Sequence, residues 1–148
     1  MPHQNILIKS IDFESEEYYQ AKQIRQEYLR TPLNLVFTDE DLETDRSACH
    51  VVAYDEDKII GCVLGIPEDE KVKIRQMLVI PEYRHQGIGS LLLTKIEKIF
   101  CELNIKYFYL HARLESLEFY RKNGYIPTGD IFMEVGIPHQ RADKLIKN

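Results

Sequence analysis

The chain has 148 residues, which suits one compact domain because a second hydrophobic core would leave too little apolar surface for either. It carries 19 lysines and arginines against 24 acidic residues, a formal net charge of −5, which disfavours a nucleic-acid-binding protein. No apolar run approaches the roughly 20 residues that span a bilayer, and the first residues lack the pattern of a secretory signal.

We therefore expect one domain, residues 1–148, located in the cytoplasm, with no nucleic-acid and no membrane partner. The three cysteines, Cys49, Cys62 and Cys101, are widely spaced among apolar residues and form no CxxC pair. This pattern predicts buried, reduced thiols in a reducing compartment, and no metal site.

The N-terminal part predicts a strand, a helix and an acidic segment. Residues Asn5–Ser10 form a short apolar run that is typical of a strand. A helix should begin after Ser15, a good N-cap, and end before Pro32, with one apolar face made of Ala21, Ile24 and Tyr28. In the acidic segment Thr38–Asp45, Thr38 is placed to cap a short helix. This segment is either a solvated surface or a substrate rim that attracts a cationic amine.

Three strands are expected next. Two apolar runs, His50–Tyr54 and Lys58–Ile66, flank residues 55–57, whose composition is typical of a hairpin turn. The third run, Lys71–Ile80, alternates between apolar and charged residues at first and then becomes wholly apolar. Such a change indicates a strand that passes into the interior, and Pro81 should end it.

The second half predicts a crossover helix and further strands. The long helix should run from Gly87 or Ile88 to Leu103, because its apolar residues recur at helical spacing. After it we expect a strand at Tyr107–Ala112, a helix at Glu115–Lys122 that Gly124 ends, and a pair of strands at Tyr125–Pro127 and Ile131–Val135. A strand, a crossover helix and another strand, among hairpins, indicate the α/β class with a mixed sheet and helices on both faces.

The stretch from Gln76 to Ser90 is the most informative, because it predicts a strand, a loop and the beginning of a helix. Gly87 and Gly89 remove side chains where the chain turns into the helix, so that a ligand can approach the backbone closely. The free N–H groups of the first helical turn, together with the helix dipole, form a site suited to a pyrophosphate. The lysine and hydroxyl residue of a P-loop are missing, and Leu92 replaces the third glycine of a GxGxxG motif.

Two motifs resemble those of the GNAT acetyltransferase superfamily. Arg84, Gly87 and Gly89 match its acetyl-CoA-binding motif (Q/R)xxGxG/A, after an apolar strand and a Pro-x-Tyr approach. The superfamily's FYxxxG(F/Y) pattern is met after the long helix by Phe119, Tyr120, Gly124 and Tyr125. The tail from Phe132 to His139 is similar to that of the ElaA-like subgroup.

The resemblance implies a mixed, mostly antiparallel sheet of about six to seven strands, with helices on both faces and one parallel strand pair splayed to hold coenzyme A. It implies an acetyl-CoA-dependent N-acetyltransferase whose acceptor is a primary amine of a small molecule or a protein. The alternative is a non-catalytic acetyl-CoA sensor. Homodimerisation is expected by analogy alone. The implied coenzyme site has Met77, Leu78 and Val79 along the pantetheine arm, Arg84 in the motif, and around the pyrophosphate His85, Gln86, Gly87, Ile88, Gly89 and Ser90.

Acetyl transfer needs no enzyme nucleophile, because the amine attacks the thioester directly, but a proton must leave the amine and another must reach the departing thiolate. Tyr120 aligns with the tyrosine that stands near the coenzyme sulfur in many relatives, so it is either the acid or a packing aromatic. Glu134 and His111, followed by His139, are the candidate bases, with a water chain as the alternative.

Three further positions have no assigned role. Two of them, on one predicted strand, have two interpretations, and the third departs from the family's pattern. Arg75 and Gln76 lie on the strand that leads into the coenzyme site, and they either line the acceptor pocket or are ordinary solvent-facing or hydrogen-bonded strand residues. Arg113 stands where many relatives place an asparagine that contacts the coenzyme, so this contact is not assigned.

Overall fold

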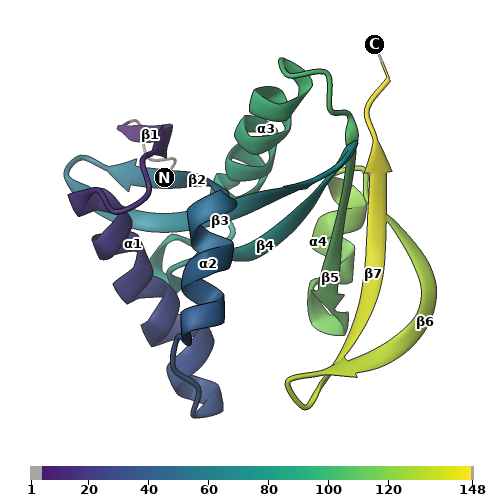
Figure 1. The fold of residues 1–148 in the computed structure, drawn as a ribbon, viewed down its shortest axis with the longest axis horizontal. Coiled ribbons are helices and arrows are strands. Elements are labelled where there is room, and N and C mark those ends of the chain that lie inside the picture. Colours follow the sequence, from purple (N-terminus) through teal and green to yellow (C-terminus); the bar gives the residue numbers. More distant parts are fainter. Residues whose placement is uncertain (1–4, 148) are drawn as a thin grey trace.

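A computed structural model describes residues 5–147 as a seven-stranded sheet with helices on both faces (Figure 1). The strand order is β1-β2-β3-β4-β5-β7-β6, and every neighbouring pair is antiparallel except β4 and β5. The strands are β1 Ile6–Ile11, β2 Cys49–Asp55, β3 Lys58–Glu68, β4 Lys71–Val79, β5 Tyr107–Arg113, β6 Ile126–Glu134 and β7 Ile137–Leu145. The predicted α/β class and the single parallel pair are confirmed.

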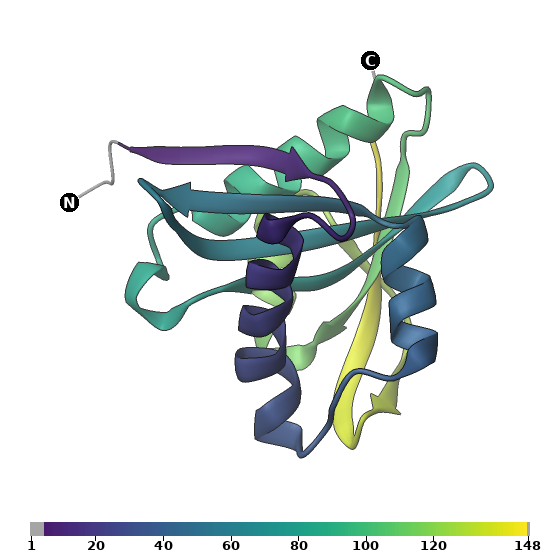
Figure 2. The ribbon, with the colours of Figure 1, turned by 60° about the vertical axis from the view of Figure 1, so that its left-hand side comes forward.

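Helices α1 (Glu16–Arg25) and α2 (Asp39–Ser47) cover one face of the sheet, and α3 (Ile88–Cys101) and α4 (Leu117–Lys122) cover the other (Figures 1 and 2). A π-helical turn and a 3₁₀ turn extend α1 to Leu33, and 3₁₀ turns also precede α3 and α4 at Pro81–Tyr83 and Leu114–Ser116. No helix within residues 5–147 is both long enough and apolar enough to cross a membrane.

The helix ends follow the local sequence signals. The Ser15 hydroxyl accepts the Tyr18 N–H at 3.2 Å, which caps α1. Thr38 and Asp41 form a reciprocal capping box at the beginning of α2. The apolar stripe of α3 is fully buried against the sheet and supplies much of the core, through Ile88, Leu92, Leu93, Ile96 and Phe100. Capping and apolar spacing therefore decide where these helices lie.

The prediction for the C-terminal tail was wrong. The two strands expected at residues 125–127 and 131–135 are one strand, β6, whose register shifts between Thr128 and Phe132. The chain turns at Val135 and Gly136, both with positive φ, and returns as β7, which was not predicted and which lies between β5 and β6. The sequence of β7 is mostly polar, so strand periodicity is weak there, and its pairing with two neighbours determines its conformation.

The sheet divides in the middle, between its two parallel strands. Pairing of β4 with β5 covers only residues 71–74 and 107–110, and the strands then diverge (Figure 2). A β-bulge in β4 accompanies the divergence, because Gln76 and Met77 together lie opposite the single residue Val63 of β3. Gln76 has φ of +56°, in the left-handed region. The facing edges of β4 and β5 are unpaired beyond this point.

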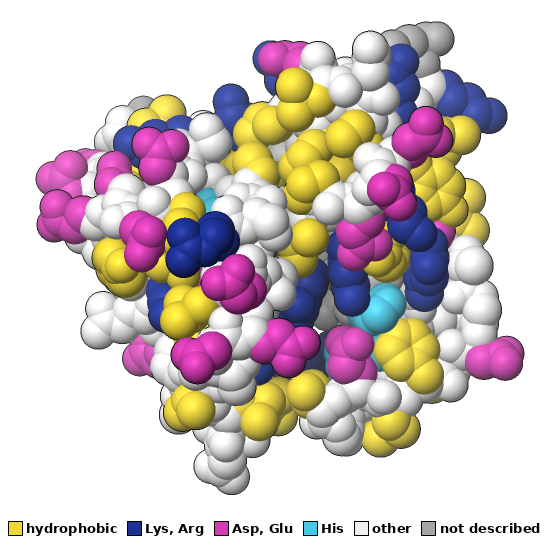
Figure 3. Space-filling model, in the orientation of Figure 1, with side chains coloured by type: hydrophobic (Ala, Val, Ile, Leu, Met, Phe, Trp, Pro, Cys, Tyr) yellow, Lys and Arg dark blue, Asp and Glu magenta, His cyan; other side chains and the backbone are white. Residues whose placement is uncertain are grey.

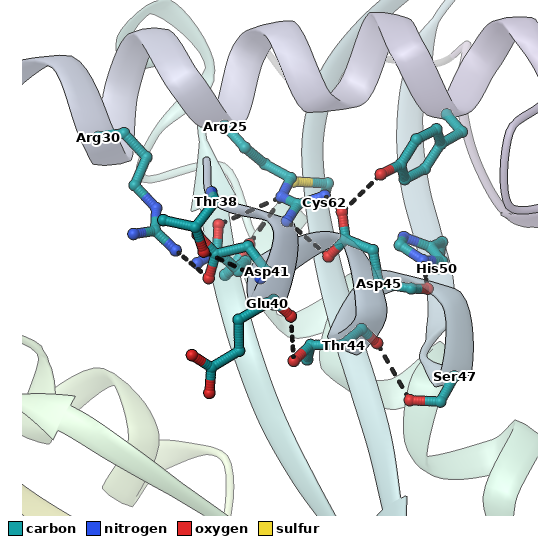
Figure 4. Close-up of polar contacts among 12 residues, drawn as sticks. Arg25, Arg30, Thr38, Glu40, Asp41, Thr44, Asp45, Ser47, His50 and Cys62 are labelled. Atoms are coloured by element: carbon teal, nitrogen blue, oxygen red, sulfur yellow. Dashed lines mark hydrogen bonds and ion pairs between the residues drawn. The ribbon is translucent and has the colours of Figure 1, made fainter. Parts of the chain in front are cut away.

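A buried polar network holds α1 and α2 against the bulge (Figure 4). The Arg25 guanidinium donates to both carboxylate oxygens of Asp45, at 3.0 and 2.9 Å, and both residues are only 2% exposed. Tyr18 donates its hydroxyl to Asp45 at 2.6 Å, and the carbonyl of Asp45 lies 2.7 Å from Nε2 of His50. Asp45 is the last residue of the acidic segment, for which a solvated surface was one of two expectations. It lies instead in the interior.

Candidate active site

A cavity of about 230 Å³ lies where the two halves of the sheet diverge. Figure 3 shows a hollow in the middle of this face, with Lys, Arg and His side chains on its walls. The cavity is bounded by the end of the first helical segment, by β4, β5 and α4, and by the β6–β7 turn. Its walls include Leu29, Arg30, Leu33, Leu35, Lys73, Arg75, Gln76, Met77, His111, Ala112, Arg113, Ser116, Tyr120, Glu134, Val135 and His139.

The three candidate bases lie together in this cavity. His111 Nδ1 is 2.9 Å from Glu134 Oε1, and His139 Nε2 is 3.8 Å from Glu134 Oε2. Since an ionised carboxylate only accepts hydrogen bonds, the proton of a neutral His111 resides on Nδ1 and leaves Nε2 as an acceptor. His139 Nδ1 lies 2.7 Å from the Ile137 carbonyl, which likewise requires a proton on Nδ1. The Phe132 ring packs against both imidazoles, with centroids 4.9 and 6.1 Å away.

The carboxylate of Glu134 is held in its charged form. Burial alone would raise its pKa, but the hydrogen bond from His111 and the charges of His111, His139 and Lys73 outweigh this, and the pKa of Glu134 is lowered. A carboxylate with a lowered pKa is a weak base but a good partner for an imidazole. Glu134 therefore accepts the hydrogen bond of His111 and orients its imidazole ring.

Tyr120 reaches the cavity from α4, on the opposite side of the sheet from α1. Burial raises the pKa of its phenol well above the ordinary value, so it keeps its proton at neutral pH. The ring packs against Phe119 and Tyr125, with centroids 5.0 and 6.0 Å away. Both interpretations of Tyr120, packing aromatic and proton donor, are compatible with this position.

The end of α4 is anchored by a buried charge network. Lys144 Nζ donates to Glu97 Oε1 at 3.0 Å and to the Asn123 carbonyl at 2.9 Å. The Tyr125 hydroxyl donates to Glu97 Oε2 at 2.7 Å. Gly124, at φ of +92°, ends the helix as predicted. These contacts tie α4 to α3 and β7, and so fix the backbone that carries Tyr120.

The predicted phosphate loop lies at the beginning of α3, outside the cavity. Its first intrahelical bond runs from the Leu91 N–H to the Gly87 carbonyl at 3.1 Å, so the N–H groups of residues 88–90 have no acceptor within the helix. His85 and Gly87 have positive φ, of +63° and +82°. This left-handed backbone turns the exposed loop into the first turn of α3. Arg84 Nε donates to the Val79 carbonyl at 2.9 Å and ties the loop to the end of β4.

The two glycines of the motif serve different purposes. Gly87 is the N-cap of α3, and a Cβ built there meets nothing within 4 Å, so its positive φ is what requires glycine. At Gly89 a Cβ would lie 2.8 Å from the ring of Phe119. Close packing of α3 on Phe119, rather than approach of a ligand alone, therefore explains this second glycine.

The structure brings only some of the predicted residues together. Tyr120, Glu134, His111, His139 and Met77 line the cavity, whereas Leu78 is buried in the core beside Val79 at the open edge of β4. Arg75 and Gln76 line it as well, as does Arg113. No residue of the acidic segment 38–45 is among its lining residues.

Sequence reasoning missed two cationic lining residues, Arg30 and Lys73. The alternation of β4 contained a signal for Lys73, because Val72 and Ile74 fill the core and Lys73 must point to the opposite face. Nothing in the sequence indicates that the turn after α1 brings Arg30 to the same cavity.

The model of the acetyltransferase (GNAT) family matches residues 10–125. The chain belongs to this family. It is 27% identical over 130 residues to the uncharacterized N-acetyltransferase YjcF of Bacillus subtilis (strain 168), covering 87% of this chain and 93% of that one. The crystal structure of Escherichia coli ElaA has the same fold, with a TM-score of 0.80 and 22% identity over 94% of this chain and 99% of that one.

A GNAT family acetyltransferase from Elizabethkingia anophelis, solved with acetyl-CoA bound, also shares the fold. Its TM-score is 0.73 and its identity 19%, over 97% of this chain and 99% of that one. Membership of the GNAT family makes the chain an acyltransferase and acetyl-CoA its acyl donor. The splayed strand pair and the helix end next to it are the features of the fold that suit a coenzyme with a long arm and a pyrophosphate.

Proposed function

We propose that this acetyltransferase passes the acetyl group of acetyl-CoA directly to a primary amine, of a small molecule or of a protein, with His111 as the base. The observation that carries the proposal is the 2.9 Å contact between His111 and Glu134 inside a cavity that Tyr120 also lines. An imidazole oriented by a carboxylate is a common general base in enzymes, whereas a carboxylate with a lowered pKa is too weak a base for an amine.

Coenzyme A would lie across the gap between β4 and β5. The unpaired edge of β4 at Met77, Leu78 and Val79 offers backbone hydrogen bonds to the pantetheine arm. The free amides of Ile88, Gly89 and Ser90, with the loop His85–Gly87 and Arg84, would surround the pyrophosphate. The acetyl thioester would then reach the bulge at Gln76 and Met77, where the cavity begins.

The chemical steps balance when the two protons lost by the acceptor nitrogen and the one gained by the thiolate are followed. His111 Nε2 removes a proton from the ammonium form of the acceptor, a loss that costs about 4.6 kcal/mol at neutral pH for a lysine-like amine. The amine nitrogen attacks the carbonyl carbon and a C–N bond forms, while a backbone N–H of β4 stabilises the oxyanion. The C–S bond then breaks, and the Tyr120 hydroxyl donates a proton to the departing thiolate. The attacking nitrogen loses its second proton, which returns through water to the Tyr120 phenolate, and the proton taken up by His111 passes to solvent. The products are an N-acetylated amine and the thiol of coenzyme A.

Thiol release from acetyl-CoA in the presence of a panel of primary amines tests this function. At least one amine should raise release well above the rate of hydrolysis without acceptor. A protein that binds acetyl-CoA in calorimetry but releases no thiol with any amine would instead be a sensor of the coenzyme.

We also propose that residues 1–148 act as one domain and that the protein works in the cytoplasm, which suits three free thiols. Homodimerisation remains a prediction by analogy. Gel filtration at several protein concentrations would measure the oligomeric state directly.

A further inference from the structure

We propose that the acceptor amine also carries an anionic group, a carboxylate or a phosphate, and that Arg75 and Lys73 bind this group. The inference deepens the proposed function and rests on it, because it names the class of acceptor for the same cavity. A free amino acid or an aminoalkyl phosphate has the required chemistry.

The first argument is the charge of the cavity. Its walls carry four cationic side chains, from Arg30, Lys73, Arg75 and Arg113, and one carboxylate, from Glu134. The whole chain has the opposite sign, with a formal net charge of −5. Cations are thus concentrated on the walls where an acceptor must enter, and Figure 3 shows Lys and Arg side chains in the hollow, with acidic side chains around its rim. Such a cavity attracts anions and repels diamines.

The second argument is that three of these four cations make no direct ion pair with a carboxylate of residues 5–147, and two of the three, Lys73 and Arg75, are on one strand. Arg30 is paired with Asp41 at 3.2 Å, and Glu134 is already bound to His111. Within residues 5–147 the Arg75 side chain, by contrast, makes no hydrogen bond and no direct ion pair, although the charge of Asp41 acts on it at longer range. In the same part of the chain, the Lys73 side chain makes no direct ion pair; it lies 6.0 Å from the centroid of the Tyr109 ring and interacts with Glu134 and Glu68 at longer range.

The unpaired cations also destabilise each other. Lys73 and Arg75 are two residues apart on β4, so their side chains leave the same face of the strand, and both are partly buried. Burial lowers the pKa of Lys73, and the charge of Arg75 lowers it further, although Glu134 and Glu68 offset part of this. A partly buried pair of like charges is costly unless an anion joins it. A ligand anion would complete this site.

The third argument is the position of the two cations relative to the base. Lys73 and Arg75 are on β4, and His111 is on β5, the other strand that borders the cavity. An anion held on β4 would leave the amine of a short molecule free to approach His111 Nε2 and the thioester. The cavity of about 230 Å³ is small, and Leu29, Leu33 and Leu35 give it an apolar side for a short aliphatic part.

Product binding tests the inference without requiring turnover. The full-length protein, saturated with coenzyme A, is titrated in a calorimeter with common N-acetylamino acids, N-acetylphosphoethanolamine, N-acetylethanolamine and N-acetylputrescine. We expect an anionic product to bind most tightly, and Arg75→Gln to weaken its binding roughly 10- to 100-fold, as for loss of one charge-assisted hydrogen bond. The carboxylate and phosphate compounds identify which anion the site prefers.

Lys71→Gln is the matched control. It removes a cation from the same strand and the same face of β4, but Lys71 does not line the cavity. Its effect on product binding should be less than about twofold. An equal loss in Lys71→Gln and Arg75→Gln would overturn the inference, because it would show a general effect of charge.

The remaining outcomes separate the inference from the proposed function. If the neutral or cationic product binds as tightly as every anionic one, or if none binds, the inference is wrong even where thiol release shows a working enzyme. If an anionic product binds through Arg75 but no amine releases thiol, the inference about the site holds and the proposed catalysis fails.

Discussion

Arg25 donates a hydrogen bond from Nε to the side-chain oxygen of Gln76 over 3.2 Å, and so connects α1 to the bulge that opens the sheet. The other two nitrogens of the same guanidinium are bound by Asp45 of α2. Two helices and one strand are therefore joined through one buried cation. Gln76 has a positive φ, and the hydrogen bond from Arg25 holds its side chain in place. The network therefore fixes the point where β4 leaves β5.

Asp45→Asn should destabilise the fold strongly. The change leaves the Arg25 charge buried with no opposite charge, and breaking a buried pair in this way costs about 3–5 kcal/mol. Glu43→Gln is the control on the same helix, since Glu43 is 75% exposed and its pair with Arg46 is worth at most about 1 kcal/mol. Urea unfolding of both variants measures the difference. Similar stabilities would show that the network is not what holds α2.

Much of the fold follows from local signals. The capping residues Ser15 and Thr38 and the apolar stripe of the long helix predict the helices, and Gly87 predicts the entry into α3. The conformation of the loop that is proposed to bind the pyrophosphate could be predicted for the same reason, because a few consecutive residues determine it.

The grouping of the three candidate bases in one cavity could be predicted only in part. Glu134, His111 and His139 were each noticed, but the sequence does not indicate that β7 inserts between β5 and β6, and this insertion is what brings the three side chains together. The cationic wall depends in the same way on contacts between distant segments, as when the turn after α1 places Arg30 over β4. Long-range pairing of polar strands leaves little trace in hydrophobic periodicity.

The two motif glycines should respond differently to alanine. Gly89→Ala drives a Cβ into the Phe119 ring, so it should weaken coenzyme binding and lower stability, and Phe119→Leu should relieve part of the loss. Gly87→Ala meets no such ring and should cost about 1–2 kcal/mol from its left-handed conformation alone. A double-mutant cycle by urea unfolding should find coupling to Phe119 for Gly89 but not for Gly87. Additive effects at both positions would contradict the packing explanation.

The lowered pKa of Glu134 predicts a pH-dependent contribution to stability. Because its folded pKa lies below the ordinary value of 4.5, the charged group stabilises the fold above that pH. The contribution is lost as the pH falls through the folded pKa. Glu134 is 43% exposed, so solvent screening keeps the effect below about 1 kcal/mol. Glu134→Gln should therefore be less stable than the parent protein at neutral pH, and the two should converge in acid, which unfolding curves over a pH series would detect.

Tyr120→Phe separates proton donation from packing, because it keeps the ring contacts with Phe119 and Tyr125 and removes only the hydroxyl. If the phenol protonates the departing thiolate, kcat should fall roughly 100-fold or more, while acetyl-CoA binding measured by calorimetry should not change. Tyr19→Phe is the control, since Tyr19 is 52% exposed and does not line the cavity. Full turnover in Tyr120→Phe would assign Tyr120 to packing and leave solvent as the proton source.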